Sequence, residues 1–262
     1  MSFTDLGGSA GFDDTALIKI SQVYPNLIHL NISNNGDLNN HSITKIPKKY
    51  NKLQFLDISY GGNITSKSPC EIAHSCNKLK HLEIGGYQNR VTDSIVHIIA
   101  EFHPTLQSLD ISDCNRLTNT AIYTIIGLCP NLRSLKLKHC DGISDTAIRK
   151  ITQYHYLETS RTTVVEEIAL SCHKLKHLDL YEVVHISNSS ISKITKICPS
   201  IVYLDLGHAE FISDAILKAV AEHLNALEYF GLKNCRRISQ KIIDTLFPDL
   251  EIGGYYSLPL GR

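Results

Sequence analysis

The stretch CPNLRSLKLKHCDGISDTAI, residues 129–148, combines two kinds of periodicity. Its first half alternates apolar and polar residues around Leu132, Leu135 and Leu137, which is typical of a half-buried strand. After Ser144 the apolar residues take the spacing of a helix face, with Ile148 one turn before residue 151. The stretch therefore predicts one unit made of a strand, a loop and a helix.

The same phrase recurs along most of the chain. The spacings between its first apolar anchors are 26, 26, 27, 26, 43, 26 and 26 residues, and those anchors are Leu27, Leu53, Leu79, Leu106, Leu132, Leu175, Ile201 and Leu227. A unit of this length cannot cover its own apolar strand face and helix stripe, so it must stack on its neighbours. The repeat predicts a solenoid with a parallel sheet on one side and helices on the other.

A Ser or Thr followed by Asp or Asn stands between the strand and helix halves. Side chains of these types accept hydrogen bonds from the free N–H groups of a first helical turn, so we expect them to be helix N-caps. The pairs are Thr92-Asp93, Thr118-Asn119, Ser144-Asp145, Ser187-Asn188 and Ser213-Asp214.

These residues resemble the cysteine-containing leucine-rich repeats of the ribonuclease-inhibitor-like class. Residues 129–148 fit that pattern almost position for position, residues 198–217 nearly so, and the resemblance covers about residues 3–252. It implies an α/β leucine-rich-repeat solenoid, a horseshoe with a parallel β-sheet on the concave face and α-helices on the convex face. We expect one domain over residues 1–262: a partial repeat 1–24, repeats 25–155, a truncated repeat 156–172, repeats 173–247, and a terminal strand and tail 248–262.

Cys140, between His139 and Asp141, raises the alternatives of a metal ligand, a nucleophile or a packing residue. Seven of the eight cysteines fall in two repeat-locked columns, one three residues past the last strand anchor and one at the helix end. Other repeats place Val183, Ala209 or Leu224 there, which favours small buried packing residues. No C-x-x-C pair is present, and without a secretion signal the thiols are expected to be reduced.

Composition and charge exclude several functions. Lys plus Arg and Asp plus Glu number 26 each, so no net field favours nucleic acid or an anionic membrane as a partner. No stretch predicts a signal peptide or a membrane span, which favours the cytoplasm or the nucleus. The repeat register separates the histidines over several strands, so we expect no catalytic residue, no metal site, no cofactor and no enzyme activity.

Polar strand positions predict the binding surface. We expect the concave face to bind a protein client through aromatic, acidic and basic side chains, because exposed aromatics form interface hot spots. The candidate residues are Tyr181, Tyr203, Tyr229, Asp57, Glu83, Asp110, Lys136 and His177. The alternative is that the acidic residues merely solvate the sheet.

The 43-residue interval is nine residues short of two repeats, with ETSRTT (158–163) in place of a strand and loop. A missing strand there would leave unpaired backbone groups or a kink, and a splice variant or faulty gene model is the other reading. The start looks like a repeat whose first anchors are missing.

By resemblance, the chain is similar to the repeat region of F-box/leucine-rich-repeat substrate receptors of cullin-RING ubiquitin ligases, and to F-box-less relatives of the mitotic-exit-antagonist type. The first role implies ubiquitin-dependent degradation of a client, and a Skp1-type adaptor as partner only if an F-box lies upstream. The sequence leaves no room for an F-box before residue 3, so an F-box-less scaffold or inhibitor stays open as the alternative.

Overall fold

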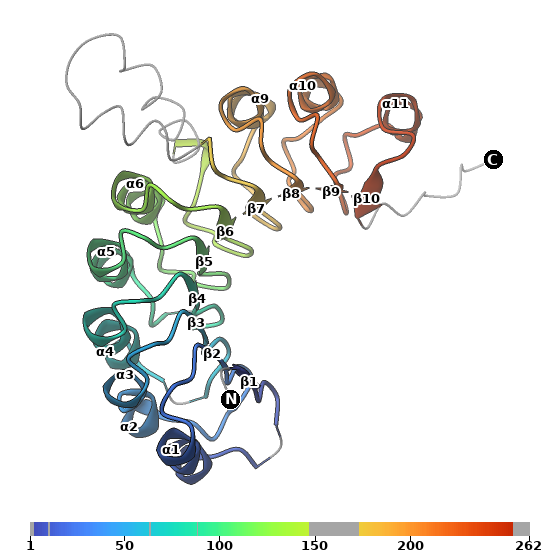
Figure 1. The fold of residues 1–262 in the computed structure, drawn as a ribbon. Helices are drawn as coiled ribbons and strands as arrows, with labels where there is room; N and C mark the ends of the chain where they lie inside the picture. Colours follow the sequence, from blue (N-terminus) through green and yellow to red (C-terminus); the bar gives the residue numbers. More distant parts are fainter. Residues whose placement is uncertain (1–2, 10, 63, 88, 147–172, 254–262) are drawn as a thin grey trace, which may run out of the picture. The chain divides into compact units, whose positions relative to one another are not determined.

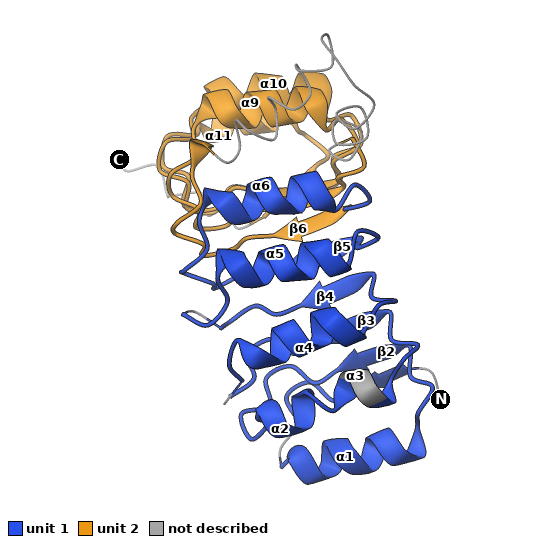
Figure 2. Cartoon of the chain, turned by 90° about the vertical axis from the view of Figure 1, so that its left-hand side faces the viewer, with its two compact units in different colours: residues 1–132 blue, residues 133–262 orange. Residues whose placement is uncertain are grey.

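The computed structural model describes residues 3–9, 11–62, 64–87, 89–146 and 173–253. The chain forms two compact units, residues 1–132 (unit 1) and residues 133–262 (unit 2) (Figure 2). The expected single domain over residues 1–262 stays a prediction. Its truncated repeat 156–172 and the tail from residue 254 onward lie outside the described residues.

Unit 1 alternates short strands with helices. Its strands pair in chain order, each parallel to the next, and its helices line one side of the sheet (Figure 1). The elements are β1 (Phe3–Asp5), α1 (Asp14–Val23), β2 (His29–Asn31), α2 (Asn40–Ile43), α3 (Ile46–Lys49), β3 (Phe55–Asp57), α4 (Lys67–Ser75), β4 (His81–Glu83), α5 (Asp93–Phe102), β5 (Ser108–Asp110) and α6 (Asn119–Leu128).

Unit 2 repeats this arrangement with a second run of parallel strands in chain order. Its described elements are β6 (Ser134–Lys136), β7 (His177–Asp179), α9 (Asn188–Ile197), β8 (Tyr203–Asp205), α10 (Ala215–His223), β9 (Tyr229–Gly231), α11 (Gln240–Leu246) and β10 (Glu251–Gly253). Each unit therefore has the predicted α/β repeat-solenoid architecture. β10 confirms the short terminal strand expected after residue 248.

The central residue of every strand from β2 to β9 points toward the helices and is almost completely buried. These residues are Leu30, Leu56, Leu82, Leu109, Leu135, Leu178, Leu204 and Phe230. On the helix side, Ile122, Ile125 and Ile126 of α6 are buried as the helical spacing predicts. The residues on either side of each central residue lie on the opposite, helix-free side of the sheet, which we call the open face.

Four of the Ser/Thr-Asp/Asn pairs stand at a described helix start, with Thr92, Thr118, Ser187 or Asp214 as the N-cap residue. Thr118 does cap α6, and its side chain accepts from the N–H of Thr120, but the Thr92 side chain makes no capping bond. Instead, the second residue of the pair reaches the next repeat: Asp93 accepts from the N–H of Thr118 at 2.8 Å and from its hydroxyl at 2.5 Å. We call this contact the inter-repeat bridge.

The inter-repeat bridge recurs through both units. Asn40 accepts from the N–H of Thr65, Asn188 from that of Ser213 and Asp214 from that of Ser239. Each bridge satisfies a backbone N–H in the loop of the following repeat, so it fastens one repeat to the next. The N-cap prediction is confirmed for Thr118 and for Ser187, which forms a capping box with Ser190, whereas the second residues of the pairs bond to the next repeat.

Strands β6 and β7 pair directly despite the 43 residues between their repeats. Their register joins Ser134 to His177, and the ladder continues beyond the strands, with the N–H of His139 donating to the carbonyl of Tyr181 at 2.9 Å. Asp145 also forms an inter-repeat bridge to Ser187. Of the alternatives for this interval, unpaired backbone groups on β6 and β7 are not observed, because each strand is the hydrogen-bonding partner of the other.

A tight turn follows the strands that end in Asp or Asn. That last residue accepts a bond from the N–H two residues later, as Asp57 does from Ser59 at 2.8 Å and Asp110 from Ser112 at 2.9 Å. The chain then passes through the left-handed region at one residue. The non-glycine residues in that conformation are Asn34, Tyr60, Asp113, His139, Glu182, His208 and Asn234, with φ between 55° and 63°.

In the part of the chain that the structure describes, no helix combines the length and the apolar character needed to cross a bilayer.

Candidate partner-binding face of unit 2

Two of the predicted tyrosines form one cluster on the open face of unit 2. Tyr203 and Tyr229 occupy the same position on β8 and β9, and their rings stack with centroids 4.4 Å apart and planes inclined by 5°. Their hydroxyls lie 3.5 Å and 3.4 Å from Oδ2 of Asp205, whose other oxygen accepts from the N–H of Gly207 at 2.8 Å. The two rings therefore form a stacked aromatic platform around a largely buried carboxylate.

Two glycines create the space for this cluster. A Cβ atom at Gly231 would lie 2.2 Å from Oδ1 of Asp205, and one at Gly207 would lie 2.6 Å from the ring of Tyr181. Because Gly207 has no side chain, the Tyr181 ring lies over it. The structure thus stacks Tyr203 on Tyr229 and places Tyr181 in another column of the same open face. We call the three tyrosines, with Asp205, the tyrosine cluster.

The electrostatics of the tyrosine cluster favour neutral tyrosines. Burial, followed by the nearby charge of Asp205, raises the pKa of Tyr203 and of Tyr229 above the usual value. Burial also raises the pKa of Asp205, although the Gly207 N–H and the tyrosine hydroxyls oppose that shift by stabilising the carboxylate. The hydroxyls therefore act as donors to Asp205 at neutral pH, and each ring keeps an apolar face for a partner.

Lysines and histidines surround Tyr181. The ammonium groups of Lys138 and Lys233 lie 4.8 Å and 5.9 Å from its ring centroid. The imidazole of His139 is stacked at 5.6 Å, and that of His208 stands edge-on at 5.0 Å. A partner that contacts the Tyr181 ring would therefore also meet polar and cationic side chains at the same position of the sheet.

His177 and Lys136, the other two candidates of unit 2, lie on the same open face. The ring centroid of His177 is 6.1 Å from that of Tyr203, at a tilt of 30°. Lys136 is half-buried and pairs in register with Asp179. His177 extends the aromatic row by one strand, whereas Lys136 lies one column away from it.

The acidic candidates Asp57, Glu83 and Asp110 belong to unit 1, where the strand register places them side by side. Asp57 is only 8% exposed, and burial raises its pKa despite the bonds it receives from Ser59. Asp57 and Asp110 both accept a backbone hydrogen bond in the turn that follows their strand. These carboxylates therefore have a structural role, in addition to any role in solvating the sheet or binding a partner. Their binding of a partner stays a prediction.

Sequence reasoning missed an aromatic ladder in unit 1. The imidazole of His29 is stacked between the rings of Phe3 and Phe55, with centroid distances of 4.0 Å and 3.9 Å, and Phe55 contacts His81 at 6.1 Å. Burial lowers the pKa of both His29 and His81, which favours the neutral rings. The sequence carried a signal for this ladder, because His29, Phe55 and His81 alternate histidine and phenylalanine at the first outward position of successive strands.

The structure answers the question raised by Cys140. Its side chain is buried, and its thiol lies 3.8 Å from the carbonyl oxygen of Lys138. In the same column, the thiols of Cys114 and Cys235 donate to the preceding repeat, at Ile84 and Leu206. The cysteines of this column are therefore buried packing residues whose thiols also lie close to backbone carbonyl oxygens. The sequence analysis predicted the packing but not these thiol contacts.

Cysteines of the second column end the helices. Cys76, Cys129 and Cys198 are helix C-caps and are buried, while the column's Cys172 lies outside the described residues. Burial raises the pKa of Cys76 and Cys129 to about 12, so neither thiol is ionised at neutral pH. Among the described residues, no group of three or more His, Cys, Asp or Glu side chains is placed to hold a metal ion.

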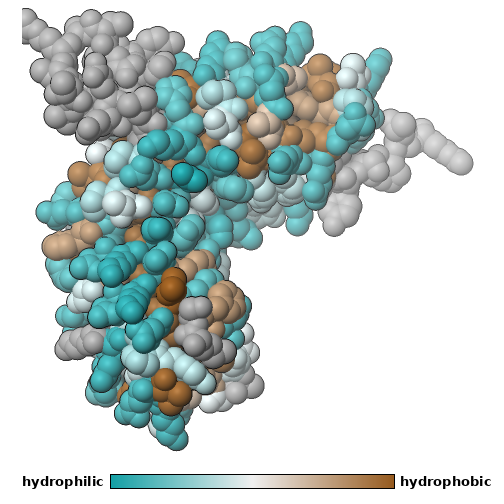
Figure 3. All heavy atoms as spheres, viewed as in Figure 1, coloured by the Kyte–Doolittle hydropathy of each residue, from teal (hydrophilic) through white to brown (hydrophobic). Residues whose placement is uncertain are grey.

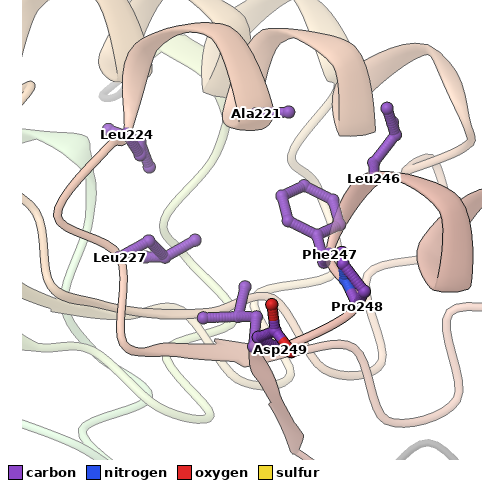
Figure 4. Close-up of a pocket in the computed structure, with 8 residues that line it drawn as sticks. Ala221, Leu224, Leu227, Leu246, Phe247, Pro248 and Asp249 are labelled. Atoms are coloured by element: carbon purple, nitrogen blue, oxygen red, sulfur yellow. The ribbon is translucent and has the colours of Figure 1, made fainter.

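A pocket of about 290 Å³ lies between the ends of α10 and α11 (Figure 4). The Phe247 ring lies between Leu227 and Leu246, and Asp249 is the one ionisable residue in its lining. Apolar residues also gather near α10 and α11 in Figure 3, among a mostly hydrophilic surface. One carboxylate without a neighbouring base or acid in the lining does not make a catalytic constellation.

Comparisons with known proteins agree with the repeat architecture. Residues 102–125 and 128–151 each match the family described as Leucine Rich repeat. Among solved structures, the yeast complex of Rad7 and Elc1 is similar, with a TM-score of 0.57 and 18% identity over 93% of this chain and 71% of the other. The leucine-rich-repeat-containing protein LegL7 from Legionella pneumophila gives 0.56 and 16% over 95% and 81%. No curated protein sequence matches the chain.

Proposed function

We propose that this chain, a leucine-rich-repeat solenoid, is a protein-interaction module that holds its partner on the open face of unit 2. The observation that carries the proposal is the tyrosine cluster, in which Tyr203 and Tyr229 are stacked at 4.4 Å and fixed by Asp205. Aromatic side chains that are already ordered lose little conformational entropy on binding, so they make effective interface anchors.

The proposed partner is a protein client, and the proposed setting is ubiquitin-dependent degradation. Support for that setting comes from the resemblance to F-box/leucine-rich-repeat receptors and from the similar fold of a yeast protein solved in complex with a second protein, Elc1. A Skp1-type adaptor would be a further partner only if an F-box lies upstream in the same gene product. The alternative is a scaffold or inhibitor that binds its partner without ligase subunits.

A non-catalytic role is part of the proposal. The open face carries its carboxylates in turns and its tyrosines in a stack, and these arrangements occupy the groups that a general acid or base would need. The buried thiols of the two cysteine columns have raised pKa values where a shift is resolved, which opposes nucleophilic use.

Affinity capture with matched baits tests the proposal. The tagged chain and its Y181A/Y203A/Y229A variant would be used on an extract of the source organism, with Tyr123→Ala, a half-buried tyrosine of α6, as the control. We expect one or more proteins to bind the native chain and the control but to be reduced at least about tenfold on the triple variant, which is the loss of about 1.4 kcal/mol or more that hot-spot truncation causes.

Purified partner and bait would then be compared by calorimetry, with circular dichroism to show that the variant is folded. Equal affinity for the native chain and a folded triple variant would overturn the proposal. Quantification of ligase adaptors in the same captures separates the two settings: their enrichment with the client supports the receptor role, and their absence favours the scaffold.

A further inference from the structure

We propose that the partner segment bound by unit 2 carries an anionic side chain, a carboxylate or a phosphate ester of a peptide, that is held over Tyr181 by Lys138 and Lys233. The inference rests on the proposed function and deepens it, because it names the chemistry that the tyrosine cluster recognises beside its aromatic surface.

The geometry places two cations at one ring. Lys138 belongs to the repeat before Tyr181 and Lys233 to the second repeat after it, yet both ammonium groups lie within 6 Å of the same centroid. The intervening repeat has Gly207 at this position, so no side chain separates Tyr181 from Lys233. The glycine thus brings together two lysines that the repeat register alone would keep apart.

Neither ammonium group takes part in a salt bridge in the described part of the chain. Glu182, the residue after Tyr181, has its carboxylate between the imidazoles of His139 and His208, at 3.5 Å and 3.7 Å.

Asp205 attracts Lys138 only at longer range. Its carboxylate is 8% exposed and already accepts bonds from Gly207 and the two stacked tyrosines. A ring contact offsets about 0.5–1 kcal/mol per cation, but it does not remove the repulsion between two cations that share the ring. A bound anion removes that repulsion and gains charge-assisted hydrogen bonds from both lysines.

The positive character continues along the same edge of unit 2. A pocket of about 350 Å³ shares His208 with the surroundings of Tyr181, and it is lined by His208, Glu210, Asn234, Arg236 and Arg237. The guanidinium of Arg237 lies 5.8 Å from the ring of Phe211, and neither arginine forms a salt bridge among the described residues. Glu210 is the one acidic residue in that lining, so cations outnumber anions along this edge.

Unit 1 provides the internal comparison. The positions that correspond to Lys138, Tyr181, Gly207 and Lys233 are Ser33, Ser59, Gly85 and Ser112, with no cation among them. The lysines are therefore a feature of unit 2 and not a requirement of the repeat. A formal net charge of zero and a small number of clustered cations favour a peptide over a long polyanion.

Fluorescence anisotropy with four labelled peptide pools tests the inference on the full chain. Each pool has a fixed central residue, which is phosphoserine, aspartate, serine or lysine, between four randomised positions on either side. We expect the phosphoserine or the aspartate pool to bind about tenfold more tightly than the serine pool, and the lysine pool to bind least. Preference for phosphoserine alone identifies a phosphopeptide, whereas equal binding of both anionic pools identifies an acidic peptide.

The charge-reversed variant K138E/K233E should lose that preference and favour the lysine pool. The matched control K193E/K218E changes two exposed lysines of α9 and α10 and should bind like the native chain. The neutral variant K138Q/K233Q, which introduces no new repulsion, should show no preference and guards against misfolding of the reversed one.

Equal binding of all four pools to the native chain, or an unchanged preference in K138Q/K233Q, would overturn the inference. Tighter binding of a nine-nucleotide oligothymidylate, lost in K138Q/K233Q, would also overturn it by assigning the lysines to nucleic acid. If the tyrosine variant loses its protein partner while the pools bind equally, the proposed function stands and the anionic recognition alone fails.

Discussion

The imidazole of His103 is buried, and replacement of this side chain gives a quantitative test of the structure. His103 follows α5 as the C-cap residue and is 1% exposed. Neither ring nitrogen has a hydrogen-bond partner in the described part of the chain. Burial lowers its pKa from 6.5 to about 4, because the charged imidazolium loses its hydration without gaining a partner.

The direction of the pH effect follows from proton binding. Between pH 6.5 and pH 4 the unfolded chain binds a proton at His103 and the folded chain does not, so the free energy of unfolding falls as the pH falls. With these two pKa values, the loss relative to pH 7.5 is about 1 kcal/mol at pH 5.5 and about 2–3 kcal/mol at pH 4.5.

The informative variant is His103→Leu, because Leu224 occupies the same C-cap position of α10 and is also buried. Leucine fills a similar volume and removes two unpaired polar atoms, each of which costs about 1–3 kcal/mol when buried. We expect the variant to be more stable than the native chain at pH 7.5, and its advantage to grow by about 1 kcal/mol at pH 5.5. Urea denaturation followed by circular dichroism at pH 7.5, 6.5, 5.5 and 4.5 measures that difference.

His97 of the same helix supplies the control. Its side chain is 58% exposed, and His97→Gln should leave the pH dependence of stability close to that of the native chain. A difference between His103→Leu and the native chain that stays constant from pH 7.5 to pH 4.5 would refute the reasoning, because it would mean that His103 is not buried in its neutral form.

Three further outcomes are expected. Gly231→Ala should lower the free energy of unfolding by about 1–3 kcal/mol, because its Cβ would overlap the buried carboxylate of Asp205. Gly127→Ala has open space around its Cβ and should raise the free energy of unfolding by up to about 1 kcal/mol. Thermal unfolding of the two variants measures this difference. Asp145→Ala should cost about 1–3 kcal/mol in urea denaturation, because it removes the carboxylate that accepts from the N–H of Ser187 and from the hydroxyls of Ser187 and Ser190. In native labelling with a maleimide at pH 7.5, Cys70 should react before the six buried cysteines that the structure describes, and peptide mapping by mass spectrometry orders the rates.

The repeat architecture could be predicted because it depends on periodicity. Leu132, Leu135 and Leu137 alternate as strand residues must, and the spacing of about 26 residues carries the pattern into both units. The order and direction of the strands followed from stacking alone. For the candidate site, the repeat register correctly placed Tyr203 and Tyr229 in one column of the open face.

Contacts between side chains that lie a repeat apart could not be predicted in the same way. Asp93 was expected to cap its own helix, but its carboxylate bonds to Thr118 in the next repeat, and local sequence does not distinguish these two acceptor roles. The position of Tyr181 depends on the missing side chain of Gly207. The direct pairing of β6 with β7 depends on which strands meet across 43 residues, which spacing alone left open.

The left-handed residue after each strand has a consequence for how the chain could change. A non-glycine residue in that conformation is held there at a free-energy cost of about 1 kcal/mol, which glycine would avoid. Yet Tyr60 bonds to Asp113 from this position, and Glu182 contacts two histidines from it. At these positions a polar or aromatic side chain is therefore kept at the expense of stability. Glycine substitutions there would raise the free energy of unfolding and would remove these side chains from the edge of the sheet. Because each repeat has its own left-handed residue, the two properties could be adjusted one repeat at a time.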